Sequence, residues 1–151
     1  MTLDNARRFA AMALEQARQA AVSGEVPVGA VVVLKGEVIG QGHNQPRALH
    51  DPTAHAEIMA IRAACAALGS ERLTGCDLWV TLEPCAMCAG AISHARIARL
   101  HYAAGDPKGG AIEHGPRLFE PGRAMHRPEV YAGIGSDEAA ALLKGFFAQR
   151  R

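Results

Sequence analysis

The stretch DLWVTLEPCAMC at residues 77–88 predicts a buried strand that runs directly into a helix. Its first half, Asp77–Leu82, is short and mainly apolar, as expected for a strand inside a sheet. Pro84 is typical of the first turn of a helix, and we expect this helix to span about ten residues and to end near Ser93 or His94. The next apolar run, Ile97–Ala103, predicts the following strand.

Outward from this stretch, hydrophobic spacing and turn residues predict the other elements. The upstream elements are a helix at Asp4–Val22, strands at Val28–Leu34 and Glu37–Gly40 joined by a turn, a loop at Gly42–Pro52, and a helix at Ala54–Leu68 capped by Thr53. The downstream elements are an irregular loop at Ala104–Gly122, a short strand at Glu129–Ala132, and a helix at Asp137–Gln149 capped by Ser136.

This alternation of helices and strands favours an α/β fold. We expect a three-layer α/β/α sandwich, in which helices cover both faces of a mixed sheet of about five strands. No stretch reads as a linker, so we expect a single domain over residues 1–151.

Composition and charge exclude several classes of protein. Sixteen Lys and Arg residues against fifteen Asp and Glu give a net charge of +1, which does not support a basic nucleic-acid-binding arm. Aromatic residues make up 5%, which argues against long stacking platforms for single strands. The longest apolar run, Val28–Leu34, is too short to span a membrane, and the N-terminus shows no secretion signal. We therefore expect a cytoplasmic protein.

Two predicted helix starts carry residues that together suit a catalytic zinc site. His55 and Glu57 lie at one start, and Cys85 and Cys88 lie at the other. The cysteines are three residues apart on a helix, so both sulfurs can hold one ion. A neutral His nitrogen and two thiolates suit Zn²⁺ and leave its fourth tetrahedral position open for water. Glu57 can then take a proton from zinc-bound water and deliver it to the substrate, as hydrolytic deamination of a ring requires.

Taken alone, each of these motifs has an ordinary explanation. A Cys-x-x-Cys pair also occurs in redox sites and as half of a structural zinc site. His55 or Glu57 alone fits the exposed start of a helix. A structural zinc site needs a fourth ligand, which the other cysteines do not supply. Cys65 continues the apolar face of its helix and Cys76 precedes a buried strand, so we expect both in the core.

His55-Ala-Glu57 together with Pro84-Cys85-x-x-Cys88 resembles the signature of the zinc-dependent nucleoside and base deaminases. Within that group, the chain looks like the bacterial tRNA-specific adenosine deaminases. The segments that carry this closer resemblance are residues 25–33, 51–58, 81–90, 106–110 and 142–147 with the basic end that follows. The resemblance implies a cytidine-deaminase-like fold and conversion of adenosine to inosine at the wobble position of a tRNA anticodon. It also implies a homodimer with one Zn²⁺ per subunit.

The same resemblance implies roles for individual residues. The residues that match the catalytic centre of the family are the zinc ligands His55, Cys85 and Cys88 and the proton shuttle Glu57. The residues that match its substrate site are Asn44 at the flipped base and its sugar, the Ala56 backbone at the base edge, and Asp106 and Lys108 along the anticodon nucleotides. We also expect a phosphate contact from His94.

Two other functions remain open. A deaminase of a free base or nucleoside, such as guanine or cytosine, shares the zinc motif and differs only in its substrate loops. The second alternative is a non-catalytic zinc or RNA-binding module. Glu57 argues against it, because such a module needs no proton shuttle. Residues 106–110 and the basic end favour RNA. Residues 45–47 and 113–123 follow the family less closely, which bears on the nucleotides that flank the edited base.

Overall fold

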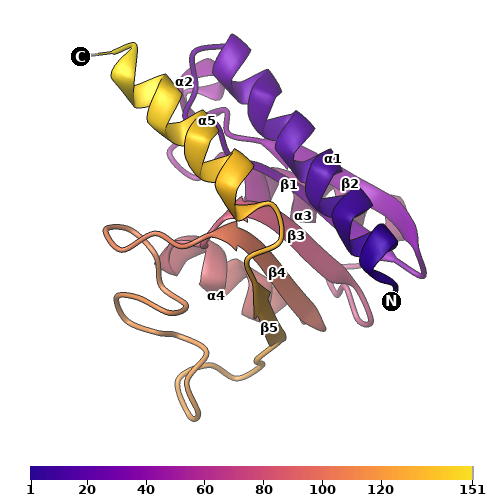
Figure 1. Ribbon diagram of the computed structural model, residues 1–151. Helices are drawn as coiled ribbons and strands as arrows, with labels where there is room; N and C mark the ends of the chain where they lie inside the picture. Colours follow the sequence, from indigo (N-terminus) through magenta and orange to yellow (C-terminus); the bar gives the residue numbers. More distant parts are fainter. Residues whose placement is uncertain (151) are drawn as a thin grey trace.

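A five-stranded mixed sheet forms the centre of the computed structural model, which describes residues 1–150 (Figure 1). The strands in chain order are β1 Gly29–Leu34, β2 Glu37–His43, β3 Asp77–Leu82, β4 Arg99–Ala104 and β5 Glu129–Ala132. Their order in space is β2-β1-β3-β4-β5. Strand β1 is antiparallel to both β2 and β3, whereas β3, β4 and β5 run parallel.

Helices cover both faces of this sheet. On one face lie α1 Leu3–Val22 and α5 Ser136–Ala148, and on the other lie α3 Ala56–Leu68 and α4 Ala86–Ala95 (Figure 1). The short α2, Pro46–Leu49, lies in the connection from β2 to α3. The expected three-layer α/β/α sandwich with a mixed five-stranded sheet is therefore confirmed.

The continuous apolar run of β1 follows from burial on both of its faces. Val31 packs with Phe9 of α1, whereas Val32 packs with Leu78 in the core beneath α3 and α4. Both valine side chains are fully buried. Successive residues of a strand point to opposite faces, so a central strand covered on both sides needs apolar residues at every position.

The helix that follows the first loop begins two residues later than the sequence predicts. Thr53 is not its cap, because the Thr53 hydroxyl and N–H both donate to the Asp51 carboxylate, at 2.8 and 2.9 Å. These bonds close a local turn and engage the hydroxyl that would otherwise cap the helix. Helix α3 therefore begins at Ala56, with His55 at the N-cap.

Two other helix starts also differ from prediction. Pro84 was expected to open its helix, but its carbonyl accepts the Ala111 N–H at 2.9 Å, and α4 begins only after Cys85 at the N-cap. Ser136 was expected to cap the last helix, but it is the first residue of α5. The N-cap is Gly135, whose φ of 81° lies in the left-handed region that favours glycine.

The segment after β1 is more ordered than the sequence predicts. Strand β2 continues past Gly40 to His43 because Gly42 still pairs with β1. Arg47 and Ala48 of the expected loop donate their N–H groups to the buried Glu25 carboxylate, at 3.2 and 2.8 Å. These bonds hold the first turn of α2 and fix the path of the chain toward α3.

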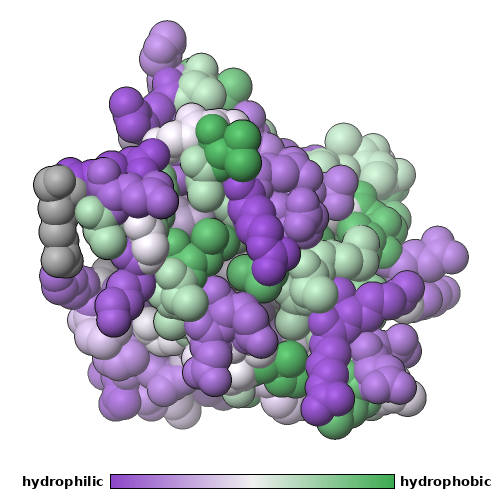
Figure 2. Space-filling model, turned by 45° about the horizontal axis from the view of Figure 1, so that its top comes forward, coloured by the Kyte–Doolittle hydropathy of each residue, from purple (hydrophilic) through white to green (hydrophobic). Residues whose placement is uncertain are grey.

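Few hydrophobic side chains gather on the visible face of the molecule, as expected when most of them are buried in the core. On the face shown in Figure 2, hydrophilic side chains predominate and hydrophobic ones form small, separate patches. Within residues 1–150, no helix is both long enough and apolar enough to cross a membrane.

Candidate active site

The candidate site lies where α3 and α4 begin. His55 is the N-cap of α3 and Cys85 is the N-cap of α4, which starts just beyond the end of β3. The two helices pack against each other on the same face of the sheet. Both helix N-termini therefore meet near the carboxyl ends of parallel strands, where open α/β sheets bind ligands.

The three predicted zinc ligands come together at this point. The His55 Nδ1 atom lies 3.6 Å from the Cys85 Sγ atom and 3.6 Å from the Cys88 Sγ atom. Tetrahedral zinc bonds of about 2.05 Å to nitrogen and 2.3 Å to sulfur place such atoms about 3.6 Å apart. All three ligand atoms lie within 4.8 Å of one another, so the cluster has the size and donor set of a three-ligand zinc site.

The two thiols share a proton unequally. A hydrogen bond from the Cys88 thiol, opposed by burial and assisted by His55, lowers the pKa of Cys85 to about 4. The same bond, together with burial, raises the pKa of Cys88. Because the thiolate is the metal-binding form, a divalent cation that displaces this proton meets two sulfur anions.

Glu57 lies beside the cluster and is almost completely buried, with 4% of its surface exposed. Burial raises the pKa of Glu57 to about 7, and the charge of Cys85 adds to this shift. A carboxyl group with a pKa near neutrality can both accept and release a proton at the working pH. Glu57 therefore has the burial and the pKa that a general acid and base would need, beside a cluster that could hold a metal ion.

Asn44 and Ala56 form one unit at the edge of this site. The Ala56 N–H donates to the Asn44 Oδ1 atom at 2.8 Å, which satisfies the first free N–H of α3. Because the Oδ1 atom is engaged in this way, the Nδ2 group is the part of the Asn44 side chain that can donate to a ligand. The Ala56 N–H fixes the orientation of the Asn44 amide, and the expected contact of the Ala56 backbone with the base edge stays a prediction.

The other expected substrate contacts lie in two different places. The Asp106 carboxylate accepts the N–H groups of Lys108 and Gly109, both at 3.1 Å, and shapes a turn just after β4. Lys108 is exposed in this turn. His94 is also exposed, but it lies in the last turn of α4, about 14 Å along the helix axis from Cys85. The structure does not bring His94 to the metal cluster.

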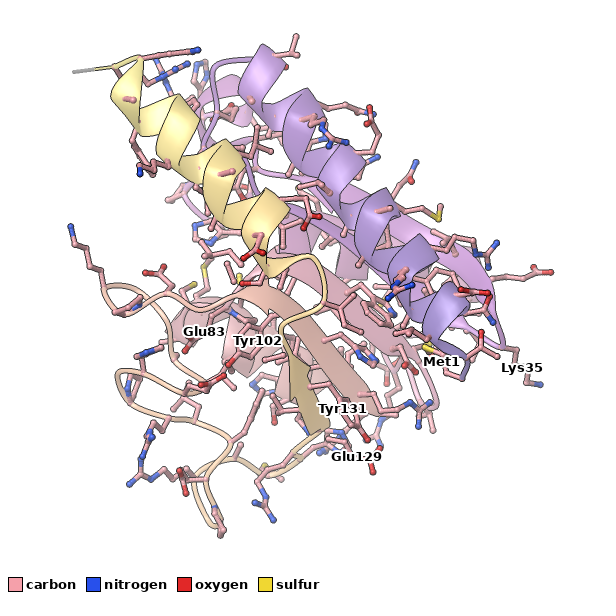
Figure 3. The ribbon with its side chains drawn as sticks, viewed as in Figure 1. Met1, Lys35, Glu83, Tyr102, Glu129 and Tyr131 are labelled. Carbon is pink, nitrogen blue, oxygen red and sulfur yellow. The ribbon has the colours of Figure 1, made fainter. Side chains whose placement is uncertain are left out.

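Sequence reasoning missed Glu83. This side chain is completely buried and accepts hydrogen bonds from the loop that carries Asp106 (Figure 3). The signal was a charged residue placed between a buried strand and a proline, because a buried carboxylate needs several donors.

A separate cavity of about 510 Å³ lies on the opposite face of the sheet, between α1, α5 and β4. Its walls include Trp79, His101 and Tyr131, whose rings stack across β3, β4 and β5 at centroid distances of 3.8 and 5.2 Å. None of the residues of the metal cluster lines this cavity, so it is not part of the candidate site.

The fold and the His–Cys–Cys cluster define a zinc-binding deaminase. The family profile of the cytidine and deoxycytidylate deaminase zinc-binding region matches residues 3–104, and the chain belongs to this family.

Among its relatives, the tRNA-specific adenosine deaminase of Agrobacterium fabrum is 56% identical over 143 residues, which cover 95% of this chain and 94% of the relative. A solved structure from a study of A-to-I editing by tRNA:A34 deaminases at the wobble position is 57% identical, with a TM-score of 0.88 over 90% of this chain and 99% of that one. The guanine deaminase of Nitrosomonas europaea is 26% identical, with a TM-score of 0.83 over 94% of this chain and 84% of that one.

Proposed function

We propose that this protein is a zinc-dependent hydrolase that converts adenosine to inosine at the wobble position of a tRNA anticodon. The observation that carries the proposal is the buried Glu57 beside a His–Cys–Cys cluster, in a chain 56% identical to a tRNA-specific adenosine deaminase. His55, Cys85 and Cys88 would hold a zinc ion, which would supply a Lewis acid to make water nucleophilic near neutral pH.

Glu57 moves the protons of the reaction. Deamination adds the oxygen of water to the carbon that carries the amino group, and the amino group leaves as ammonia. One proton must therefore pass from water to a ring nitrogen, and another must reach the leaving amine. A carboxyl group with a pKa of about 7 suits both transfers, because it accepts and releases a proton with little cost at neutral pH.

Asn44 orients the nucleoside. Its Oδ1 atom is engaged by the Ala56 N–H, so its Nδ2 atom faces the substrate as a donor to the base or the sugar. Asp106 and Lys108 contact the neighbouring nucleotides of the anticodon loop, whose bases are unpaired and can enter a pocket. His94 meets a more distant phosphate, in keeping with its place at the far end of α4.

Four further properties belong to the proposal. Each chain binds one zinc ion, the protein is a homodimer, it acts in the cytoplasm, and residues 1–151 form a single domain. The zinc count is supported by the one His–Cys–Cys cluster found within residues 1–150. The homodimer and the cytoplasmic location rest on the resemblance to the tRNA-specific adenosine deaminases, and the single domain rests on the lack of a linker in the sequence. Metal analysis and sedimentation of the purified protein measure the first two.

A substrate comparison tests the proposal against a deaminase of free bases. The structural likeness to a guanine deaminase makes guanine the first competing substrate. We would incubate the zinc-loaded protein with an anticodon stem-loop carrying a wobble adenosine and, separately, with guanine, cytosine and adenosine. The proposal predicts inosine in the stem-loop and no ammonia from the free compounds. Turnover of guanine with an unchanged stem-loop would contradict it.

A further inference from the structure

The buried side chain of Glu83 collects hydrogen bonds from a long irregular loop. Its Oε1 atom accepts the Asp106 N–H at 3.0 Å and the His114 Nδ1–H at 2.6 Å. Its Oε2 atom accepts the N–H groups of Ile112, Glu113 and His114, at 3.0, 3.0 and 3.1 Å. All of these partners are N–H donors, so the Glu83 carboxylate acts only as an acceptor.

The hydrogen bonds to the Glu83 carboxylate hold a loop that contains no helix or strand of its own. No helix or strand forms between the end of β4 at Ala104 and the start of β5 at Glu129. The loop also packs directly on the carboxylate, because a Cβ atom on Gly110 would lie 2.4 Å from Glu83 Cδ. The far end of the loop is held separately, since His126 Nε2 lies 2.6 Å from the Ile97 carbonyl oxygen.

Glu83 also sits two residues before the metal ligand Cys85. One side chain thereby joins the segment that starts α4 to the loop that presents Asp106 and Lys108. We propose that Glu83, with His114 as its partner, is a positioning residue that sets the distance between the metal site and the RNA-contacting loop. This inference rests on the proposed function, because it assigns the loop to RNA.

The test uses a variant that keeps the shape of Glu83 and removes its charge. In Glu83→Gln, one acceptor oxygen becomes an amino group that faces the loop N–H donors. Glu71→Gln is the control, because this side chain is exposed and lies outside the loop. His114→Ala removes one donor to the carboxylate, and His114→Asn replaces the Nδ1–H with an amide N–H as a conservative variant.

Amide hydrogen exchange, zinc content and steady-state kinetics on the stem-loop are then measured. We expect Glu83→Gln to speed exchange about tenfold or more at Ile112, Glu113 and His114, with no change at His126. Zinc content stays at the wild-type level. KM rises about tenfold while kcat changes less than about threefold, since the loop binds substrate and does no chemistry. His114→Ala speeds exchange and raises KM by smaller factors. His114→Asn returns both quantities toward their wild-type values.

Several results would overturn the positioning role. They are wild-type exchange and KM in Glu83→Gln, a parallel loss of zinc and kcat with KM unchanged, or equal effects in Glu71→Gln. If Glu83→Gln does not fold, unchanged exchange and KM in His114→Ala would overturn it instead. A wild-type protein that is inactive on the stem-loop would refute the proposed function. The comparison of amide exchange in wild type and Glu83→Gln tests separately whether Glu83 holds the loop, because it needs no activity.

Discussion

Gly40 lets α3 lie close to β2. Replacing this glycine should both destabilise the protein and lower its rate of deamination. A Cβ atom at Gly40 would lie 2.5 Å from the Ala60 carbonyl oxygen and 2.6 Å from the Ala64 nitrogen. An ordinary contact is at least 3.4 Å, so Gly40→Ala must push the helix away by about 0.9 Å. Overpacking of this kind costs about 1–3 kcal/mol, which lowers the Tm of a chain of this length by about 2–12 °C.

The displacement should also reach the candidate active site, because α3 carries His55 at its N-cap and Glu57 in its first turn. A shift of about 1 Å in a catalytic group can lower the rate by up to about 100-fold. Gly145→Ala is the control, since a Cβ atom on this exposed helical glycine meets nothing within 4 Å. That change should stabilise the protein by about 0.5–1 kcal/mol.

Calorimetry of both zinc-loaded variants, followed by deamination assays, makes the comparison. The expected order of Tm is Gly145→Ala, wild type, Gly40→Ala, with reduced kcat only in the last. A Gly40→Ala protein with wild-type Tm and kcat would refute the close packing of α3 on β2.

Three further changes test the site and its surroundings. Cys88→Ala should release most of the metal, whereas Cys65→Ala should keep it, as metal analysis of both proteins would show. Asn44→Ala should raise KM for the stem-loop about tenfold. Asn44→Asp should raise KM at least as much without lowering Tm, because its carboxylate still accepts the Ala56 N–H but cannot donate and adds a negative charge. A wild-type KM in both variants would contradict the role of Asn44. Burial lowers the pKa of His43, so the folded protein binds fewer protons there than the unfolded chain. Stability should therefore fall as the pH drops below about 6.5, and melting curves should show a smaller fall in His43→Gln.

The sequence predicted the elements of the fold because they depend on local patterns. The two-sided burial of β1 appears in the sequence as an unbroken apolar run, and the helix faces appear as periodic spacing. The helix starts were less predictable, because competing contacts decide them. Thr53 bonds to Asp51 instead of capping α3, and the Pro84 carbonyl is taken by Ala111, which lies far along the chain.

The residues of the candidate site also differ in how far local sequence patterns predict them. His55, Glu57, Cys85 and Cys88 could be proposed from the sequence because their residue types and spacing are typical of a metal site with a proton carrier, and the structure brings the three proposed ligands together. Glu83 was missed because its partners lie 23 to 31 residues away, and only the folded loop brings them together.

The role of Glu57 tests the account most directly. Glu57→Gln and the control Glu71→Gln, an exposed glutamate after α3, should both keep wild-type zinc content and Tm. Deamination of the stem-loop adenosine should fall by at least about 100-fold in Glu57→Gln and stay unchanged in Glu71→Gln, because an amide cannot carry the proton. Activity of zinc-loaded Glu57→Gln within a few-fold of the wild type would contradict the proton transfer on which the proposed function depends.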